Sequence, residues 1–565
     1  VFDIAGVGPH AIALYAALPA ITESVDLDGL TQPGSDANDM VVLDGTHAGD
    51  VDGIVLTAGE STIRGLSIRG FSGGGIRIAG GFGNRIEGNR IASNGRSGVC
   101  VTGERAVANS ILGNQIVENV GTGIELEGHV ALQAGTRGHG PNQQVNAPLL
   151  SDVKRLDDGD ATGARIEGTL ESTPDTSFRL EFFATRAPVG AKTHERREGE
   201  TLLKAIDATT DRNGKVDFVI VLPSGVESRT LVSATATDAS GNTSEFSAPL
   251  QAPAIIKSWN NVLGGNWNTA ASWTPSGVPA ATDDVQITLD GTYTVTINTV
   301  QSAASLTLGG ATGNQTLAVT ANTLTLSAAS VVNANGILSH AGGTIAGTGS
   351  LTINGTFNWS AGVMTGAGTT TVNGPFNLSG LVSINGSRIL NNASTANWTA
   401  GVNQGMWTGT GSVINNTGTW DAKVDGGAIV NQYGGATTFN NFGSFKKSAG
   451  AGSTLINIPF VNTGTVNAQS GTISLGGGGS NSNTLTTTGA GATLAFAAGV
   501  FDLNAGTNVS GPGTILLNSS GTVNVNSAMV IPGTTTFTFT AGTLAGTGTL
   551  TLNGTFNWSA GVMTG

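Results

Sequence analysis

A short pattern that returns at nearly even spacing places the strongest constraint on how this chain folds. The pattern is a glycine followed by an apolar residue, any residue and a second apolar residue. Its four copies begin 22, 23 and 25 residues apart, at Gly53, Gly75, Gly98 and Gly123. Repetition with a period of about 20–50 residues is typical of solenoids, propellers and repeat arrays. We therefore expect a chain that winds in similar coils rather than one that folds around a single compact core.

The last two copies share a longer register, in which the pattern of residues 84–98 returns 25 positions later as residues 109–123. Within each period the apolar residues alternate, as Val99 and Val101 do and as Ile86 and Ile91 do with their polar neighbours, which is the pattern of a strand with one buried face. Three short strands and three corners fit into one period, and nothing in it suggests a crossover helix. The spacing predicts a parallel β-helix, in which each coil stacks on the last at roughly 4.8 Å.

Asparagines recur at the corners of these predicted coils. Asn89 returns as Asn114, and Asn94 returns as Asn119. Side chains at equivalent corners of stacked coils stand over one another, so their amides can form hydrogen-bonded ladders along the axis. We therefore expect a structural role for these four asparagines rather than a role in binding a ligand.

The run Asn-x-Ile-x-Gly-Asn-x-Ile-x-x-Asn of residues 84–94 resembles the repeats of right-handed parallel β-helix proteins with the pectin-lyase-like fold. The segment from Gly8-Pro9-His10 to Gln32-Pro33-Gly34 is similar to the start of that domain in large bacterial secreted proteins. The resemblance covers residues 1–145 and implies the fold. It implies no single activity, because many proteins of this kind bind or build structure rather than cut.

Residues 146–252 break the solenoid period. Residues 178–183 and 216–220 alternate like strands, and the turn sequence Asp-Arg-Asn-Gly stands between them at residues 211–214. About 100 residues of short strands with such turns predict an immunoglobulin-like β-sandwich. Residues 235–246 resemble the closing strands of such modules in bacterial surface proteins.

Clustered oxygen atoms in this module suit a calcium ion, since hard cations take oxygen ligands. Asp211, Asn213 and Asp217 supply the side chains for such a site. Asp-x-Asn-Gly is equally the sequence of an ordinary hairpin turn. Both interpretations stay open at the level of the sequence.

Residues 253–300 contain Gly-x-Trp, Trp, Pro and Asp-Asp-Val elements that resemble a recurrent unit of bacterial adhesin-like repeat proteins. We expect this segment to cap the start of a second β-solenoid, because an exposed end coil needs covering. Residues 301–565, rich in Gly, Thr and Asn, form that solenoid in the prediction. Residues 347–366 return as 546–565 with only two substitutions, so we expect a longer parent protein with further copies.

The predicted fold is therefore all-β: a right-handed parallel β-helix, an Ig-like β-sandwich and a second β-solenoid. Composition agrees with dense β-structure, since charged residues make up 11% of the chain and hydrophobic residues 39%. Five basic residues and six aspartates occupy residues 253–565, so most of the net charge of −13 lies before them. Acidic character argues against nucleic acid as a partner, and no apolar run has transmembrane length.

The single cysteine excludes an intramolecular disulfide. Cys100 lies in the apolar run Val-Cys-Val, which favours a buried, inert thiol. Glu87, Arg90 and Glu118 on the first helix have the residue types of a polysaccharide-cleaving site, but positions on a solvated face explain them better, so no catalytic residue is assigned. Glycoside hydrolysis requires two carboxyl groups across one bond. His139 sits in a Gly-His-Gly that resembles the motif of polygalacturonases, but the Asn-Thr-Asp and Arg-Ile-Lys companions are missing, so a linker is favoured.

Exposed tryptophans on a long solenoid face are suited to stacking on sugar rings, although core positions would explain them as well. The five candidates of the second solenoid are Trp359, Trp398, Trp407, Trp420 and Trp558. The leading hypothesis is a non-catalytic, adhesin-like protein, secreted or on a bacterial cell surface, that binds polysaccharide or a host or matrix surface. One alternative is a polysaccharide lyase or glycoside hydrolase with its site on the first helix, and another is a purely structural stalk. No cofactor is expected apart from the calcium ion considered above.

Overall fold

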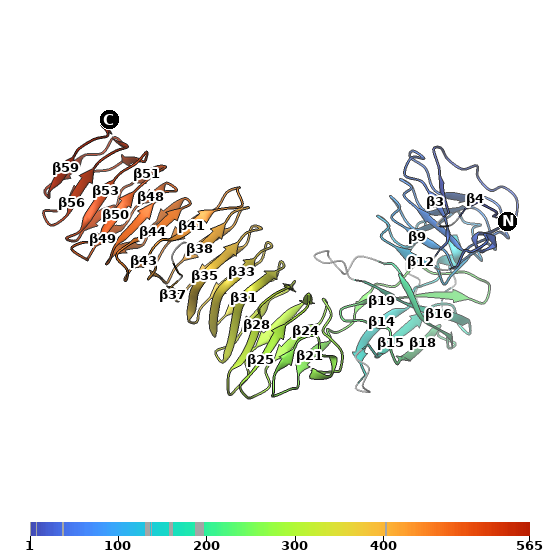
Figure 1. The fold of residues 1–565 in the computed structure, drawn as a ribbon. Coiled ribbons are helices and arrows are strands. Elements are labelled where there is room, and N and C mark those ends of the chain that lie inside the picture. Colours follow the sequence, from blue (N-terminus) through green and yellow to red (C-terminus); the bar gives the residue numbers. More distant parts are fainter. Residues whose placement is uncertain are drawn as a thin grey trace. The chain divides into compact units, whose positions relative to one another are not determined.

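The computed structural model describes residues 2–6, 8, 10–36, 39–129, 136, 138–156, 162–186, 197–399, 401 and 404–565. The chain divides into two compact units, Val1–Ile255 and Ile256–Gly565. Strands dominate both units (Figure 1). The helices among the described residues are three short 3-10 turns, η1 (Gly29–Thr31), η2 (Pro141–Gln144) and η3 (Ala270–Ser272). None of the described helices has the length and apolarity to span a bilayer.

The first unit opens with a parallel β-helix whose coils build three sheets. One sheet has the order β1 (Ala11–Ala13), β3 (Val41–Asp44), β6 (Leu66–Arg69), β9 (Arg90–Ala92), β12 (Gln115–Val117). A second has the order β13 (Ile124–Leu126), β10 (Val99–Thr102), β7 (Ile76–Ala79), β4 (Ile54–Leu56). The third has the order β11 (Ser110–Leu112), β8 (Arg85–Glu87), β5 (Thr62–Arg64), β2 (Asp26–Asp28). The recurring Gly-apolar pattern is the second sheet, so the predicted parallel β-helix is confirmed.

Asparagine ladders occupy the corners between these sheets. The Nδ2 of Asn89 donates to the Oδ1 of Asn114 at 3.0 Å, and the Nδ2 of Asn94 donates to the Oδ1 of Asn119 at the same distance. Each of these Oδ1 atoms also accepts the backbone N–H of the asparagine one coil earlier. All four side chains are buried, so the ladders satisfy corner amides that water does not reach. The predicted structural role is confirmed.

Two antiparallel sheets follow in the same unit. The first comprises β14 (Leu149–Arg155), β15 (Ala164–Glu171) and β18 (Lys215–Leu222). The second has the order β17 (Thr201–Thr209), β16 (Ser177–Thr185), β19 (Leu231–Asp238), β20 (Leu250–Gln251). Both contribute to one hydrophobic core, in which the rings of Phe182 and Phe218 lie 5.4 Å apart. The two antiparallel sheets therefore share one core, as the two layers of a β-sandwich do.

This antiparallel region covers the last coil of the β-helix with its own polar groups. The backbone N–H of Asn119 donates to the Oε1 of Glu198 at 3.0 Å, where the preceding coil uses an asparagine. The N–H of Asn109 donates to Asn142, and that of Leu126 to Glu245, each at 3.0 Å. Side chains that are distant in the sequence thus replace the amide acceptors of a further coil.

The second unit is a stack of parallel coils with one continuous core (Figure 1). A 16-stranded sheet runs from β23 (Trp273–Thr274) and β21 (Ile256–Trp259) to β60 (Val562–Met563). A 22-stranded sheet runs from β22 (Gly265–Asn266) to β59 (Phe556–Trp558). The segment predicted as a cap begins with the first coil, in which Trp273 packs against Trp259 and Trp267, with ring centroids 5.0 Å apart in both pairs. The short β23 pairs antiparallel with β21 and covers its outer edge.

The short repeats in the middle of this unit lie in register. β39 (Val413–Asn416), β42 (Thr438–Asn441) and β45 (Phe460–Asn462) are consecutive neighbours in the 16-stranded sheet. Their inward asparagines belong to a buried ladder with amide contacts of 2.5–2.7 Å, made of Asn392, Asn416, Asn441, Asn462 and Asn481. A second ladder, with contacts of 2.9 Å, runs along the outer face through Asn391, Asn415 and Asn440.

Neighbouring asparagines of β42 allow a matched test of the buried ladder. Asn441→Ala leaves the Oδ1 of Asn462 without its donor in the core, so we expect a loss of about 2–3 kcal/mol in the free energy of unfolding. Asn440→Ala removes the partner of Asn415 on the outer face and should cost less than about 1 kcal/mol. Urea unfolding followed by tryptophan fluorescence measures both, because all eight tryptophans lie in the second unit. Equal losses in the free energy of unfolding would show that the buried ladder stabilises the unit no more than the outer one does.

The cover over the β-helix gives a second prediction. Glu198→Ala should remove the acceptor of the buried Asn119 amide, at a cost of about 1–3 kcal/mol, and should speed hydrogen exchange in residues 115–126. Glu198→Gln keeps an acceptor oxygen and should retain most of the protection. Exchange followed by mass spectrometry on the whole chain makes the comparison. Unchanged exchange in the alanine variant would contradict the capping role.

Candidate functional site

Three of the tryptophans predicted to stack on sugars lie in the core. The exposed fractions of Trp359, Trp398 and Trp420 are 0%, 2% and 0%, so the prediction is wrong for these three residues. Trp359 occupies an inward position of β33 (Thr356–Met364) and stacks on the ring of His340 at 5.8 Å. Burial lowers the pKa of His340 to about 4, so this ring is neutral and packs as an aromatic side chain.

Trp558 is 54% exposed but occupies the position that Trp359 has in the duplicated repeat. β33 lies between β31 (Gly336–Ala346) and β35 (Phe376–Ile384), whereas β59 has β56 (Thr536–Phe539) as its one neighbour. Trp558 stacks on Phe539 at 6.0 Å from that single side. Its exposure therefore follows from its place in the stack and does not mark a site.

Trp407 lies outside the core on an interior coil. It points outward from β38 (Gly405–Thr408), between the buried residues Met406 and Thr408, and is 36% exposed. Tyr433, 39% exposed, follows β41 (Gly427–Asn431) on the next coil. The two ring centroids are 6.5 Å apart and the ring planes make an angle of 80°. We call Trp407 and Tyr433 the aromatic pair.

The chain holds Tyr433 of the aromatic pair by backbone and side-chain contacts. Its hydroxyl donates to the Oγ of Ser383 at 3.1 Å, and its N–H donates to the carbonyl of Thr408 at 3.1 Å. Ser383 is the register partner of Trp407 in β35. Gly409 lies against this segment, and a Cβ there would meet the Cβ of Tyr433 at 2.8 Å. Glycine is therefore required where the corner passes Tyr433.

The first unit carries an open groove between the β-helix and the antiparallel region. Its floor includes a column of glycines at equivalent corners, each with positive φ: Gly65, Gly88 and Gly113. Leu30 and Leu202, 49% and 42% exposed, lie along it with five charged side chains: Arg64, Arg85, Glu87, Arg179 and Glu181. Glu87, one of the candidate catalytic residues, is therefore in a cleft of the surface.

The charges of this groove are paired with one another. Arg85 contacts Glu87 at 2.6 Å, and Arg179 contacts Glu181 at 2.9 Å. Glu181 is buried and also accepts the N–H of Gly113 at 2.8 Å. Arg64 contacts Asp28 at 2.6 Å, which holds the pKa of Arg64 above its ordinary value. Each of these carboxylates has an arginine partner, so none has the environment of a free general base.

The other candidate catalytic residues lie elsewhere. Glu118 lines a second groove and accepts a hydrogen bond from the Oγ of Ser93 at 3.2 Å. Arg90 donates to the side chain of Gln115 at 2.9 Å. His139 is exposed and lies two residues before η2, which covers the last coil. This position agrees with the linker that the sequence favours. The structure does not gather Glu87, Arg90, Glu118 and His139 into one site.

The calcium candidates are engaged in a hairpin. The Oδ1 of Asp211 accepts the N–H groups of Asn213 and Lys215 at 2.8 and 2.9 Å, and these bonds lower the pKa of Asp211. Asp217 instead accepts the hydroxyl of Thr169 at 2.6 Å. Over the described parts of the chain, no three His, Cys, Asp or Glu side chains are grouped as metal ligands.

The thiol of Cys100 is half-hidden in β10. Burial, followed by the charge of Glu125, raises the pKa of Cys100 to about 12. The group therefore stays protonated at neutral pH and is a poor nucleophile. The raised pKa agrees with the expected inert thiol, but Cys100 is only partly buried, because it takes an outward position of β10 between the buried Val99 and Val101.

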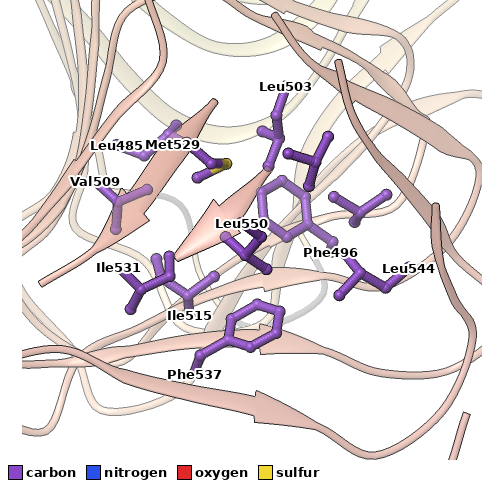
Figure 2. A pocket seen from close by; sticks show the side chains of 12 residues that line it. Leu485, Phe496, Leu503, Val509, Ile515, Met529, Ile531, Phe537, Leu544 and Leu550 are labelled. Atoms are coloured by element: carbon purple, nitrogen blue, oxygen red, sulfur yellow. The ribbon is translucent and has the colours of Figure 1, made fainter. Parts of the chain in front are cut away.

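A gap inside the core of the second unit is apolar throughout. Figure 2 shows the side chains around it, which carry carbon and one methionine sulfur and point toward a common centre, among them Phe496, Met529, Ile531 and Phe537. The cavity volume is about 10 Å³, which is close to the smallest cavity that can hold one water molecule. It is a packing gap and offers no group for recognition or catalysis.

Comparison with known proteins supports the fold of the first coils. Residues 34–134 match the family model described as right handed beta helix region. No curated protein matches the chain. The match lies in the segment whose three parallel sheets are described above, so it agrees with the resemblance found in the sequence. It carries no statement about activity.

The difference between the tryptophans is measurable in solution. Iodide should quench Trp407 and Trp558 and leave the six buried tryptophans nearly unaffected. Trp407→Phe should lower the number of quenchable tryptophans from two of eight to one of seven, whereas Trp359→Phe should leave both quenchable residues among the remaining seven and so raise the quenchable fraction slightly. Stern–Volmer analysis of the two variants checks this. An unchanged quenchable fraction in Trp407→Phe would contradict the exposure of Trp407.

Proposed function

We propose that the chain is part of a non-catalytic, adhesin-like repeat protein, secreted or on a bacterial cell surface, that binds carbohydrate through its long solenoid faces. The observation that carries this proposal is a regular array of outward hydroxyl groups on the second unit. One column passes through consecutive coils in register, at Thr395, Thr419, Ser444, Thr465 and Thr484. A second comprises Ser453, Thr472, Thr493, Thr514 and Thr536.

Such columns suit a long polymer better than a small substrate. Stacked strands repeat at roughly 4.8 Å, so each coil offers the same donor and acceptor at a fixed step along the axis. A single hydroxyl contact with a sugar is weak because it replaces a contact with water. Many such contacts on one rod add up through multivalency, which raises the overall affinity without any strong individual site.

The proposal keeps the domain organisation that was predicted from the sequence. Residues 1–145 form a right-handed β-helix, 146–252 an Ig-like module, and 253–565 a second solenoid that begins with the tryptophan-containing segment. The common core of the two antiparallel sheets supports the Ig-like assignment. Both solenoids would serve as a stiff support, with the Ig-like module covering the end of the first.

A polysaccharide lyase or glycoside hydrolase is the second candidate. The groove that contains Glu87 and three arginines is the observation in its favour, since a cleft lined by charged groups is where a sugar polymer would be cut. Pairing of each carboxylate with an arginine weakens this candidate. The third candidate is a stalk that binds nothing itself.

One experiment separates the three. The chain is mixed with insoluble and soluble glycans, uronate-rich and neutral, and assayed for retention, new reducing ends and unsaturated products. Retention without product supports the binding protein. Product that disappears in Glu87→Gln, but not in Glu118→Gln, would replace it with an enzyme acting in the groove. If the chain is neither retained on a glycan nor forms product, the structural stalk is the remaining candidate.

A further inference from the structure

We propose that the aromatic pair, Trp407 and Tyr433, is a carbohydrate subsite for uncharged pyranose rings. This inference rests on the proposed function and names one place where the solenoid face recognises its ligand. It begins from the position of Trp407, which strand alternation turns to the outer face while Met406 fills the core.

A partly exposed tryptophan is out of keeping with its surroundings. The six tryptophans that pack in the second unit are at most 2% exposed, and the outer strand positions elsewhere are dominated by threonine, serine and asparagine. Trp407, by contrast, takes an outward position of its strand and leaves 36% of its surface in water. A large aromatic surface left beside a second exposed ring is a feature of recognition sites.

The geometry of the pair suits a sugar ring. The planes of Trp407 and Tyr433 make an angle of 80° with centroids 6.5 Å apart, an edge-to-face arrangement that we call the corner, and each ring keeps more than a third of its surface exposed. A pyranose has an apolar face of C–H groups and a rim of hydroxyls. Its C–H face can lie on one aromatic face while its edge contacts the other ring.

Polar groups beside the corner are uncharged. Residues 404–410 and 430–436 contain no Asp, Glu, Lys or Arg. Asn431 donates its Nδ2 to the carbonyl of Gly435 at 2.8 Å, an arrangement that fixes the amide beside Tyr433. Amides and hydroxyls match sugar hydroxyls, whereas these two segments offer no countercharge to a uronate or sulfate. The ligand class is therefore a neutral glycan.

The corner is held before any ligand arrives. Tyr433 is tied through its hydroxyl to Ser383, two coils before it, and its N–H is bonded to Thr408. Trp407 belongs to a regular strand between β35 and β41. Binding to such a site loses little conformational freedom, which favours affinity.

The test uses the whole chain and two defined probes, a soluble neutral β-1,4-glucan hexasaccharide and polygalacturonate. Trp407→Ala and Tyr433→Ala should each weaken binding of the neutral probe by roughly tenfold or more in calorimetry. Tyr433→Phe keeps the ring and should lose less. Phe442→Ala and Trp558→Ala remove other exposed aromatics, 52% and 54% exposed, and should bind as the unaltered chain does.

The outcomes separate the site from the function. Equal binding by the unaltered chain and Trp407→Ala, with circular dichroism unchanged, would overturn the subsite and leave the carbohydrate-binding function in place. Preference for polygalacturonate would overturn the neutral class. If the unaltered chain binds neither probe and is retained on no glycan of the wider panel, both the subsite and the proposed function fall.

Discussion

Hydrogen bonding between successive coils is the interaction on which both stacks of parallel strands depend. Each interior strand of the stacks finds its backbone partners one coil earlier and one coil later, so successive coils must present their groups at the same place. The corners meet the same demand with side chains, through the asparagine ladders of both units. Because buried amides are costly when unpaired, the register propagates from coil to coil. The repetition in the sequence is the consequence.

The outermost coils of the stacks need a cover, and the last coil of the first unit is covered differently from the first coil of the second. In the first, Glu198, Asn142 and Glu245 accept the N–H groups that another coil would have bound. In the second, the first coil folds β23 back along β21 in the antiparallel direction and fills its interior with three tryptophans. Both arrangements leave fewer unpaired strand edges for another chain to join.

The sequence predicted what depends on local period and missed what depends on distant contacts. The spacing of the Gly-apolar pattern was sufficient for the coils, and equal spacing of Asn89 and Asn114 was sufficient for the ladder. Glu198 as a cap had no local signal, since its partner Asn119 is 79 residues away. The burial of Trp359 does have a local signal: Trp359 is two positions from Phe357, so both side chains face the same side of the strand. Trp407 is adjacent to Met406 and faces the opposite side by the same rule.

The direction of the bonds in these stacks also has a mechanical meaning. Bonds between parallel coils lie along the axis of the stack, so a pull on the two ends of the second unit loads each coil interface in series. Such a load opens the coils one after another from the weaker end, and not all at once. A coil of roughly 20 residues releases about 70 Å of extended chain when it opens. A protein built in this way lengthens stepwise under force and dissipates work at every step, while the coils that have not opened keep their surface intact.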